Sequence, residues 1–310
     1  MSFLEELASV LQKSEAEVEG FLEGAPKKYR TYKIPKRTSG FRTIAQPSKE
    51  LKEYQRAFLK IQSLPIHNAA KAYRKNLSIK DNATVHKSSR YFLSMDLENF
   101  FNSISSDLFW RVYSRHFDSF SGQDKRVMES LLFWSPGKSN KQGLVLSVGA
   151  PSSPLLSNFF MYTFDLIMSN YCDETNILYT RYADDFTFST NDKNILFSVP
   201  EVVKGFLEKC FGRGINVNKR KTVFSSKAHN RHVTGITINN NGDLSLGRER
   251  KRYIKHLIFQ YSINKLEEGM LQHLQGLLAF SNHIEPMFIF TLNEKYTKEL
   301  MLRISEERHV

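Results

Sequence analysis

Two adjacent aspartates, Asp184 and Asp185, lie between two short runs of strand-forming residues at 177–183 and 186–190. This pattern predicts a β-hairpin whose turn contains the acidic pair. A third acidic residue, Asp96, comes at the end of an apolar, strand-like run. Carboxylate oxygens are the ligands that Mg²⁺ prefers, and clustered carboxylates on rigid strands can hold two divalent ions for transfer of a nucleotidyl group. These residue types therefore indicate metal-assisted chemistry on phosphate esters.

Each of these aspartates also fits an ordinary structural role. Asp is common in turns, because its side chain bonds to the neighbouring backbone, and Asp96 could cap a following helix. However, an aspartate at a buried strand end costs free energy unless it is paired or bound to a metal. One such aspartate plus an Asp-Asp hairpin is the smallest carboxylate set for a two-metal site. Glu98 is a further candidate ligand, which we expect to be solvated.

The charge of the chain favours a polyanionic partner. The sequence contains 44 lysines and arginines against 32 acidic residues, so its formal net charge is +12. Residues 26–90 alone hold 17 Lys or Arg and three acidic residues, with tyrosines and phenylalanines among them. Basic residues interleaved with aromatic ones are typical of nucleic-acid-binding surfaces. The alternatives are a solvated basic surface and a patch for an anionic membrane.

The elements that must position these residues form an α+β pattern. Helices are predicted at 3–24, 48–64, 105–134, from Pro154 onward, 199–211 and 248–310, with a capping box at Ser14 and Glu17. Strands are predicted at 29–47 around a turn at 38–40, and at 91–97, 177–183, 186–190, 215–217, 222–225, 232–238 and 243–246. Residues 135–152, rich in Gly, Ser and Pro, are predicted to connect two of these elements.

Several classes of protein are disfavoured. Two cysteines are too few for a disulfide framework, and no Cys and His residues have the spacing of a zinc site. No GxxxxGK[ST] loop for ATP is present. No apolar run approaches the roughly 18 residues of a membrane span, and the acidic N-terminus lacks a signal-peptide pattern. We therefore expect a cytoplasmic protein with no membrane partner.

Four segments, taken in their order along the chain, are similar to the palm motifs of a polymerase family, the reverse transcriptases. They are MDLENFFNSI at 95–104, GAPSSPLLSN at 149–158, YTRYADDFTFS at 179–189 and INVNKRKT at 215–222. Two more, Asn82 to His86 (NAxxH) and Val233 to Gly235 (VTG), match elements specific to retron enzymes. The chain thus resembles retron-type bacterial reverse transcriptases over about residues 28–280. The resemblance implies a right-hand polymerase with an N-terminal helix and fingers at 1–90, a palm of antiparallel sheet and helices at 91–247, and a helical thumb at 248–310.

The resemblance also implies roles for single residues. Asp96, Asp184 and Asp185 would hold two Mg²⁺ ions, or Mn²⁺, at the primer end. Phe101 would be the steric gate that collides with a ribose 2′-hydroxyl, with ordinary aromatic packing in the core as the alternative. Lys221 would lie near the leaving pyrophosphate as a positive charge or proton donor, the alternative being a solvated lysine.

Other residues would contact the nucleotide by the same resemblance. Lys36 and Arg42 match the fingers pattern KxxxGxR and would grip the triphosphate. A tight turn against the incoming nucleotide and template would be formed by Gly149, Ala150 and Pro151. One departure concerns Val148, which stands where many family members have a glutamine. It weakens the transfer of that glutamine's role and leaves the metal site unaffected.

The retron-specific motifs and the thumb would recognise RNA. Asn82 and His86 would either contact the structured RNA or support the fingers–palm junction that does. Recognition would also involve the VTG residues and the start of the thumb: Val233, Thr234, Gly235, Arg248 and Arg252. Phosphate contacts from such a basic helix position a duplex without reading its sequence, and a solvated helix face is the alternative.

A retron enzyme would copy a structured partner RNA, which is both template and primer, into branched multicopy single-stranded DNA using dNTPs. It would act in anti-phage defence together with a separately encoded effector. The rival hypotheses are another bacterial reverse transcriptase, such as a group II intron type, and an RNA- or DNA-binding scaffold that restrains a toxin. Asn82 to His86 favours the retron type, we expect no maturase or endonuclease extension after the thumb, and three acids at these places favour an enzyme.

Overall fold

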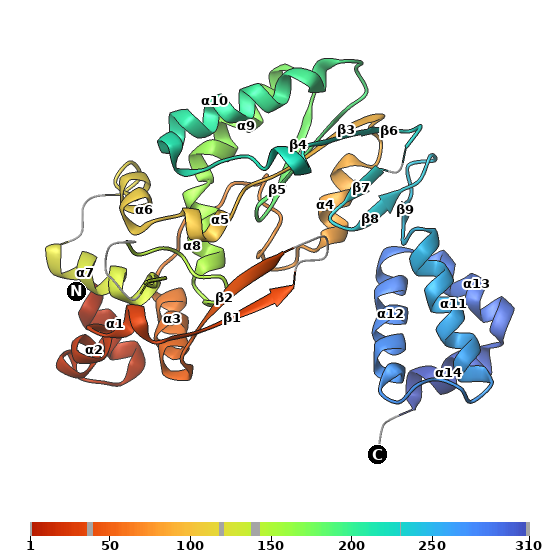
Figure 1. Cartoon of the computed structure of the whole chain (residues 1–310), viewed down its shortest axis with the longest axis horizontal. Helices are drawn as coiled ribbons and strands as arrows, with labels where there is room; N and C mark the ends of the chain where they lie inside the picture. The colour runs from red at the N-terminus through yellow and green to blue at the C-terminus, as the bar shows by residue number, and fades with distance from the viewer. Residues whose placement is uncertain (1, 36–39, 118–120, 138–142, 230, 308–310) are drawn as a thin grey trace.

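A four-stranded antiparallel sheet lies at the centre of the structure, which is a computed structural model describing residues 2–35, 40–117, 121–137, 143–229 and 231–307. The strand order is β4-β5-β3-β6. The strands are β3 (Tyr91–Asp96), β4 (Leu178–Tyr182), β5 (Asp185–Thr190) and β6 (Val223–Ser226). Figure 1 shows this sheet in the upper part of the molecule, with the C-terminal helices apart from it at the lower right. The predicted α+β class is confirmed.

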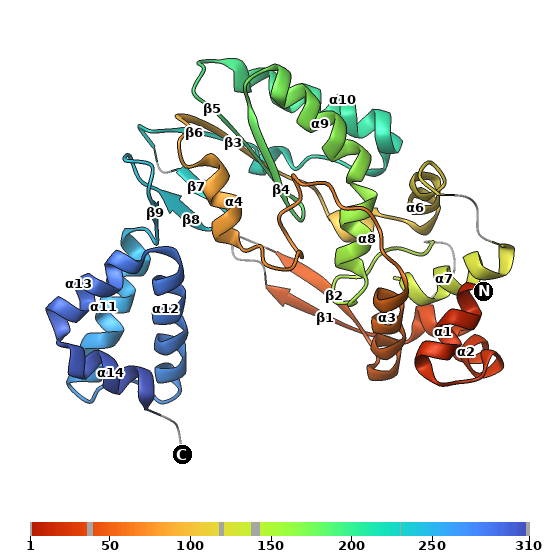
Figure 2. The ribbon, with the colours of Figure 1, turned by 180° about the vertical axis from the view of Figure 1, so that it is seen from behind.

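Both faces of this sheet are covered. In β5 apolar and polar residues alternate, so its phenylalanines and its hydroxyl side chains lie on opposite faces. On one face, Phe186 of β5 stacks on Phe164 of α9 with ring centroids 5.3 Å apart. On the other face, Thr187 and Ser189 point towards the side of α4, which Figure 2 shows from behind. The covering helices are α4 (Ile79–His86), α8 (Ser153–Phe160), α9 (Tyr162–Glu174) and α10 (Val199–Phe211).

The N-terminal part consists of short helices and a basic two-stranded hairpin. The helices α1 (Phe3–Leu11) and α2 (Glu15–Leu22) are separated at Ser14, whose predicted capping box with Glu17 is present. The hairpin pairs β1 (Tyr29–Pro35) with β2 (Phe41–Pro47), and α3 (Lys49–Ile61) follows. Three more helices complete this side: α5 (Phe100–Ser103), α6 (Ser106–Tyr113) and α7 (Gly122–Leu132). Residues 36–39, including Lys36, lie outside the described part of the chain.

The C-terminal part is a separate lobe with its own apolar core (Figure 1). Its helices are α11 (Arg248–Ser262), α12 (Met270–Ile284), α13 (Pro286–Tyr296) and α14 (Lys298–Glu306). They share this core with Ala83, Phe92 and a small sheet of β7 (Arg231–Val233), β8 (Ile236–Ile238) and β9 (Leu244–Ser245). The small sheet therefore joins the C-terminal helices to the central sheet. No helix in the described ranges is both long and apolar enough to cross a membrane.

Two local predictions were wrong, and one helix was not predicted. The predicted strand at 232–238 is a hairpin, because Thr234 and Gly235 both have positive φ and turn the chain. The predicted strand at 215–217 contributes a single bridge between Val217 and Leu97. The helix α4 was not predicted, because its sequence IKDNATVH combines buried polar residues with a weak apolar face. Its start is nevertheless marked by a capping box of Ser78 and Asp81.

Candidate active site

The predicted acidic residues meet at one end of the central sheet. Asp96, the last residue of β3, is the direct cross-strand partner of Asp185, the first residue of β5. Ala183 and Asp184 form the two-residue turn between β4 and β5, and the Leu97 amide donates to the Asp184 carbonyl at 3.0 Å. Side chains of directly paired residues lie about 5 Å apart at Cβ. The backbone thus brings three carboxylates together from positions almost 90 residues apart in the sequence.

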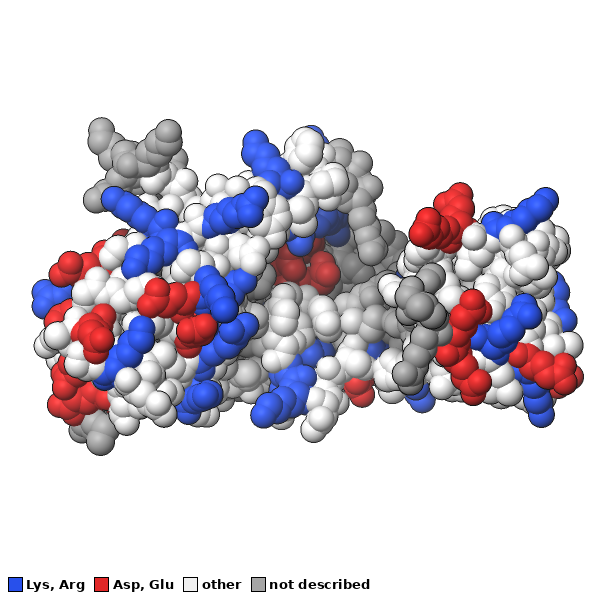
Figure 3. All heavy atoms as spheres, turned by 90° about the horizontal axis from the view of Figure 1, so that it is seen from below, with Lys and Arg blue, Asp and Glu red and all other residues white. Residues whose placement is uncertain are grey.

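The carboxylates disfavour one another's charged form. Burial, followed by the charges of Asp184 and Asp96, raises the pKa of Asp185 to about 7. Burial also raises the pKa of Asp184, with a smaller contribution from Asp96. Figure 3 shows acidic side chains at the bottom of a hollow in the middle of the molecule, with lysines and arginines on the surrounding surface. Negative charge concentrated in this way favours the binding of a cation.

Asp96 is held by two neighbours from the segment after α10. The Lys221 Nζ lies 2.7 Å from Asp96 Oδ2, and the Asn218 side-chain amide donates to Asp96 Oδ1 at 3.3 Å. The Asn218 backbone amide also donates to the Asp96 carbonyl at 2.7 Å. Lys221 is therefore a member of the acidic cluster, whereas Glu98 is exposed, as expected for a solvated residue.

The residues present fit a divalent cation. Carboxylate oxygens are hard ligands that suit Mg²⁺. Burial, together with the neighbouring carboxylates, raises the pKa values of Asp184 and Asp185, so a nearby cation would favour their charged forms. Within the described residues, no three His, Cys, Asp or Glu side chains are already grouped at metal-binding distances. Asp96 is instead paired with Lys221. A cation would replace the repulsion between the three carboxylates by attraction.

The predicted glycine turn lies against the basic hairpin. The Ala45 amide of β2 donates to the Val148 carbonyl at 3.1 Å, next to Gly149. Gly149 has φ +125°, and a Cβ on it would lie 3.3 Å from the Ala45 carbonyl oxygen, so a side chain would be strained here. Ala150 is buried and Pro151 half-buried behind it. On the same hairpin, Arg42 is close enough to the acidic cluster to lower the pKa of Asp184.

Phe101 lies at the edge of the main apolar core. It is half-buried, and its ring centroid lies 5.4 Å from that of the buried Phe100. Its other neighbour is Tyr73, with centroids 6.5 Å apart. The Phe101 ring is therefore held by the core on one side and only partly covered, so it stays accessible to a ligand.

Comparison with known proteins identifies the family. Residues 34–238 match the family model of the reverse transcriptases (RNA-dependent DNA polymerases). The chain is 45% identical to the retron Ec83 reverse transcriptase of Escherichia coli over 304 residues, with 97% of each chain covered. It is 31% identical to two further E. coli enzymes: the retron Ec73 reverse transcriptase, with 89% of each chain covered, and the retron Ec86 reverse transcriptase, with 87% of this chain and 83% of that one covered.

The chain belongs to the retron-type reverse transcriptases. It is an RNA-directed DNA polymerase with the predicted right-hand fold, and its family acts on RNA and DNA and generally uses divalent metal ions. The predicted roles of its individual residues remain predictions, which the geometry supports to different degrees.

The retron-specific motif NAxxH lies inside the protein. His86 is fully buried, and its ring nitrogens bond to Ser189 Oγ of β5 and Thr180 Oγ1 of β4, both at 2.7 Å. Burial lowers the pKa of His86 to about 3, so the ring is neutral. Asn82 is also fully buried and bonds to Thr234 Oγ1 of the VTG motif at 3.4 Å. Of the two alternatives for Asn82 and His86, these positions favour structural support over direct contact with RNA.

The other residues predicted to bind RNA differ in accessibility. Val233 is buried, Thr234 is half-buried and Gly235 is exposed in the turn between β7 and β8. Arg248 and Arg252 are exposed on α11 of the retron enzyme's C-terminal lobe. The Val233 side chain therefore cannot contact RNA in this structure, whereas both arginines can.

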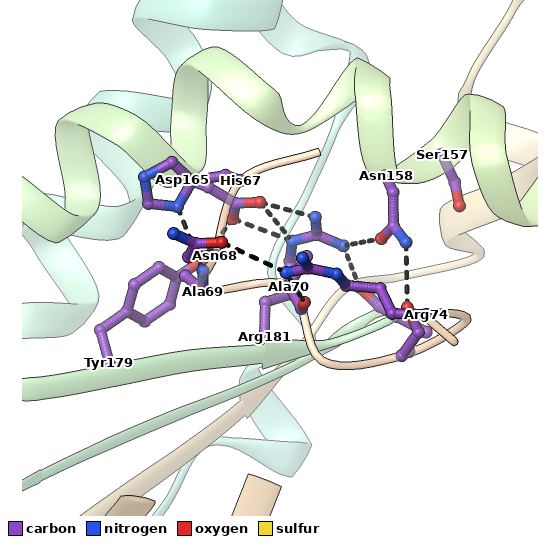
Figure 4. Close-up of polar contacts among 12 residues, drawn as sticks. His67, Asn68, Ala69, Ala70, Arg74, Ser157, Asn158, Asp165, Tyr179 and Arg181 are labelled. Atoms are coloured by element: carbon purple, nitrogen blue, oxygen red, sulfur yellow. Dashed lines mark hydrogen bonds and ion pairs between the residues drawn. The ribbon is translucent and has the colours of Figure 1, made fainter. Parts of the chain in front are cut away.

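A buried ion pair behind the β4–β5 hairpin was not predicted. Arg181 of β4 and Asp165 of α9 are fully buried and lie 2.6 Å apart, as Figure 4 shows. Arg181 also donates to Asn158 Oδ1 at 3.1 Å and to the Ala183 carbonyl of the turn between β4 and β5 at 3.0 Å. An arginine inside an apolar strand was the available signal, since a buried guanidinium requires a carboxylate partner. Only the fold identifies that partner.

Proposed function

We propose that this reverse transcriptase copies part of a structured partner RNA into branched, multicopy single-stranded DNA by two-metal nucleotidyl transfer. The observation that carries the proposal is the cross-strand pairing of Asp96 with Asp185 beside the Asp184 turn. It supports a polymerase mechanism because an acidic cluster with raised pKa values would be unfavourable without a bound cation. A protein that only bound RNA would not need it.

The acidic residues and Lys221 would form the reacting centre. Asp96, Asp184 and Asp185 would hold two Mg²⁺ ions, with Mn²⁺ as the alternative. When bound, such ions lower the pKa of the attacking primer hydroxyl and stabilise the leaving pyrophosphate. Lys221 would supply positive charge, or a proton, at the pyrophosphate. In the structure its ammonium already lies beside Asp96, which supports this assignment.

The fingers side would bind the nucleotide. Arg42, together with Lys36, would bind the triphosphate, and the turn of Gly149, Ala150 and Pro151 would lie against the base pair being formed. The absence of a side chain at Gly149 allows the close backbone approach that this role requires. Phe101 would exclude the ribose 2′-hydroxyl. Its half-buried ring pairs with that of Tyr73, whose hydroxyl is near enough to Asp184 for this charge to raise the Tyr73 pKa.

RNA recognition would involve the C-terminal lobe. We assign fingers to 1–90, palm to 91–247 and thumb to 248–310, with Arg248 and Arg252 of α11 contacting phosphates of the partner RNA. Thr234 and Gly235 would lie next to this RNA, while Val233, Asn82 and His86 would support them from the interior. The hydrogen bond between Asn82 and Thr234 supports such a link between the two retron motifs.

The biological role that we propose is anti-phage defence. The enzyme and its RNA–DNA product would restrain a separately encoded effector protein. This part of the proposal is supported by the retron family assignment. Co-purification of a neighbouring gene product with the wild-type enzyme, lost when the partner RNA is deleted, would test it.

The polymerase proposal is tested by expressing the chain with its native upstream locus and isolating short, branched DNA. The wild-type enzyme should produce this DNA, and an Asp184→Asn/Asp185→Asn variant should not, although it should still bind the RNA. The control is Asp192→Asn, an exposed aspartate beyond the other end of β5. Equal DNA yields from the double variant and the control would contradict the mechanism.

A further inference from the structure

Tyr73 has an unusual backbone conformation. Its φ is +60°, a region that aromatic residues rarely adopt because the Cβ crowds the backbone. Its side chain is 52% exposed, so it is not held there by burial in the core. Such conformations persist where the surrounding structure enforces them, and they are concentrated at functional sites.

The segment that carries Tyr73 is fastened to the catalytic hairpin. The Asn158 side-chain amide donates to the Ala72 carbonyl at 3.0 Å, and Arg181 donates to the same asparagine. Figure 4 shows this network, in which Arg181 lies between Asp165 and Asn158. Because Arg181 also holds the Ala183 carbonyl, one buried guanidinium positions both the catalytic turn and the backbone next to Tyr73.

The Tyr73 ring faces the active site. Its centroid lies 6.5 Å from that of Phe101, with the ring planes at 63°, an edge-on arrangement. Burial and the charge of Asp184 raise the pKa of the Tyr73 hydroxyl, and Arg42 lowers it, so both charged groups are near the hydroxyl. Tyr73 therefore lies among the predicted gate, one catalytic acid and the basic hairpin.

We propose that Tyr73 is a specificity-determining residue that braces the Phe101 ring against the ribose 2′-hydroxyl of an incoming nucleotide. The inference rests on the proposed role of Phe101 as the sugar gate. A gate excludes a hydroxyl only if its ring cannot swing away, and Phe101 is half-buried, so the core alone does not fix it. Phe100 supports Phe101 from the core side, and Tyr73 supports it from the fingers side.

The aromatic ring of Tyr73 performs this role, and its hydroxyl does not. An edge-on aromatic pair at this separation contributes a modest stabilisation, so loss of the Tyr73 ring should reduce the preference for dNTP over rNTP about 2- to 10-fold. Tyr73→Phe keeps the ring and should retain the wild-type preference. Tyr73→Ala and Tyr73→Gly both remove the ring. Because glycine, unlike alanine, adopts a positive φ without strain, comparing the two variants separates the effect of backbone strain from the effect of losing the ring.

The test is primer extension by purified variants with their RNA, measuring kcat/KM for one dNTP and the matching rNTP. Tyr73→Ala and Tyr73→Gly should lower the discrimination equally, and Phe101→Ala should lower it further. Adding Tyr73→Ala to Phe101→Ala should change nothing more, because the brace acts through the gate. Phe197→Ala is the control, since Phe197 is an exposed aromatic of the segment after β5 and its ring pairs with that of Phe224 in β6.

Unchanged discrimination in both Tyr73→Ala and Tyr73→Gly would overturn the proposal, as would a full additional loss in the double variant. If Phe101→Ala also left sugar selectivity unchanged, both the gate and the brace would be wrong, while the polymerase proposal would stand. A wild-type enzyme that makes no DNA from its RNA would instead contradict the proposed function itself.

Discussion

Replacing Asp185 by asparagine should stabilise the protein while abolishing its activity. The pKa of Asp185 is raised from 3.8 to about 7 by burial and by the neighbouring Asp184 and Asp96. A raised pKa means that the folded state favours the protonated form of this carboxyl. The contribution of this protonated carboxyl to the free energy of unfolding is fully present below pH 4, and it is lost as the pH rises through about 7.

The size of the effect follows from this shift. Three pKa units correspond to about 4 kcal/mol, and because Asp185 retains solvent contact we reduce this to about 1–2 kcal/mol for screening. Asparagine resembles the protonated carboxyl in shape and charge. The change that Asp185→Asn makes in the free energy of unfolding should therefore be about 1–2 kcal/mol more stabilising at pH 8 than at pH 4.

The assay is urea unfolding of the wild type and the variant at pH 4 and pH 8 in EDTA. Added Mg²⁺ at pH 8 should stabilise the wild type more than the variant, because the cation offsets the same repulsion. Asp192→Asn is the control, with little change at either pH. An Asp185→Asn variant that is destabilised equally at both pH values would refute the electrostatic reasoning.

Three further predictions concern groups around the acids. Lys221→Ala should lower kcat about 100-fold or more with little change in RNA binding, and Lys221→Arg should restore part of the rate if positive charge is what matters. The pKa of His86 is lowered to about 3, so the free energy of unfolding of the wild type should fall as the pH drops below about 6.5, where the unfolded chain gains a proton. In urea unfolding, His86→Gln should make this dependence on pH less steep. Asp165→Ala should cost about 3–5 kcal/mol by leaving Arg181 buried without its partner, and calorimetry showing a loss below 1 kcal/mol would contradict the importance of that pair.

Local patterns predicted the elements that carry the acids. The runs at 177–183 and 186–190 are strand-forming, and Asp favours turns, so the hairpin was predictable from neighbouring residues alone. The capping box at Ser14 was predictable for the same reason. Local patterns failed at 232–238, where Thr234 adopts a positive φ that its residue type does not indicate.

Long-range contacts decided the functions of several polar residues. From its type alone, His86 could have faced either RNA or the interior, and its two partners lie 94 and 103 residues away. Tyr73 could not be placed at the active site, because its position depends on Asn158 and on the strained backbone that the fold imposes.

The sequence by itself determined the chemistry and the family of this protein, since the three aspartates, the palm motifs and the basic charge are properties of residue type and order. The tertiary structure decided which groups share a site. The register of β3 on β5 sets Asp96 opposite Asp185, and a shift of one residue would turn one of the two carboxylates to the other face of the sheet. This register depends on the packing of the two faces of the sheet against α4 and α9. Such packing joins residues that are far apart in the sequence, so no short segment could predict it.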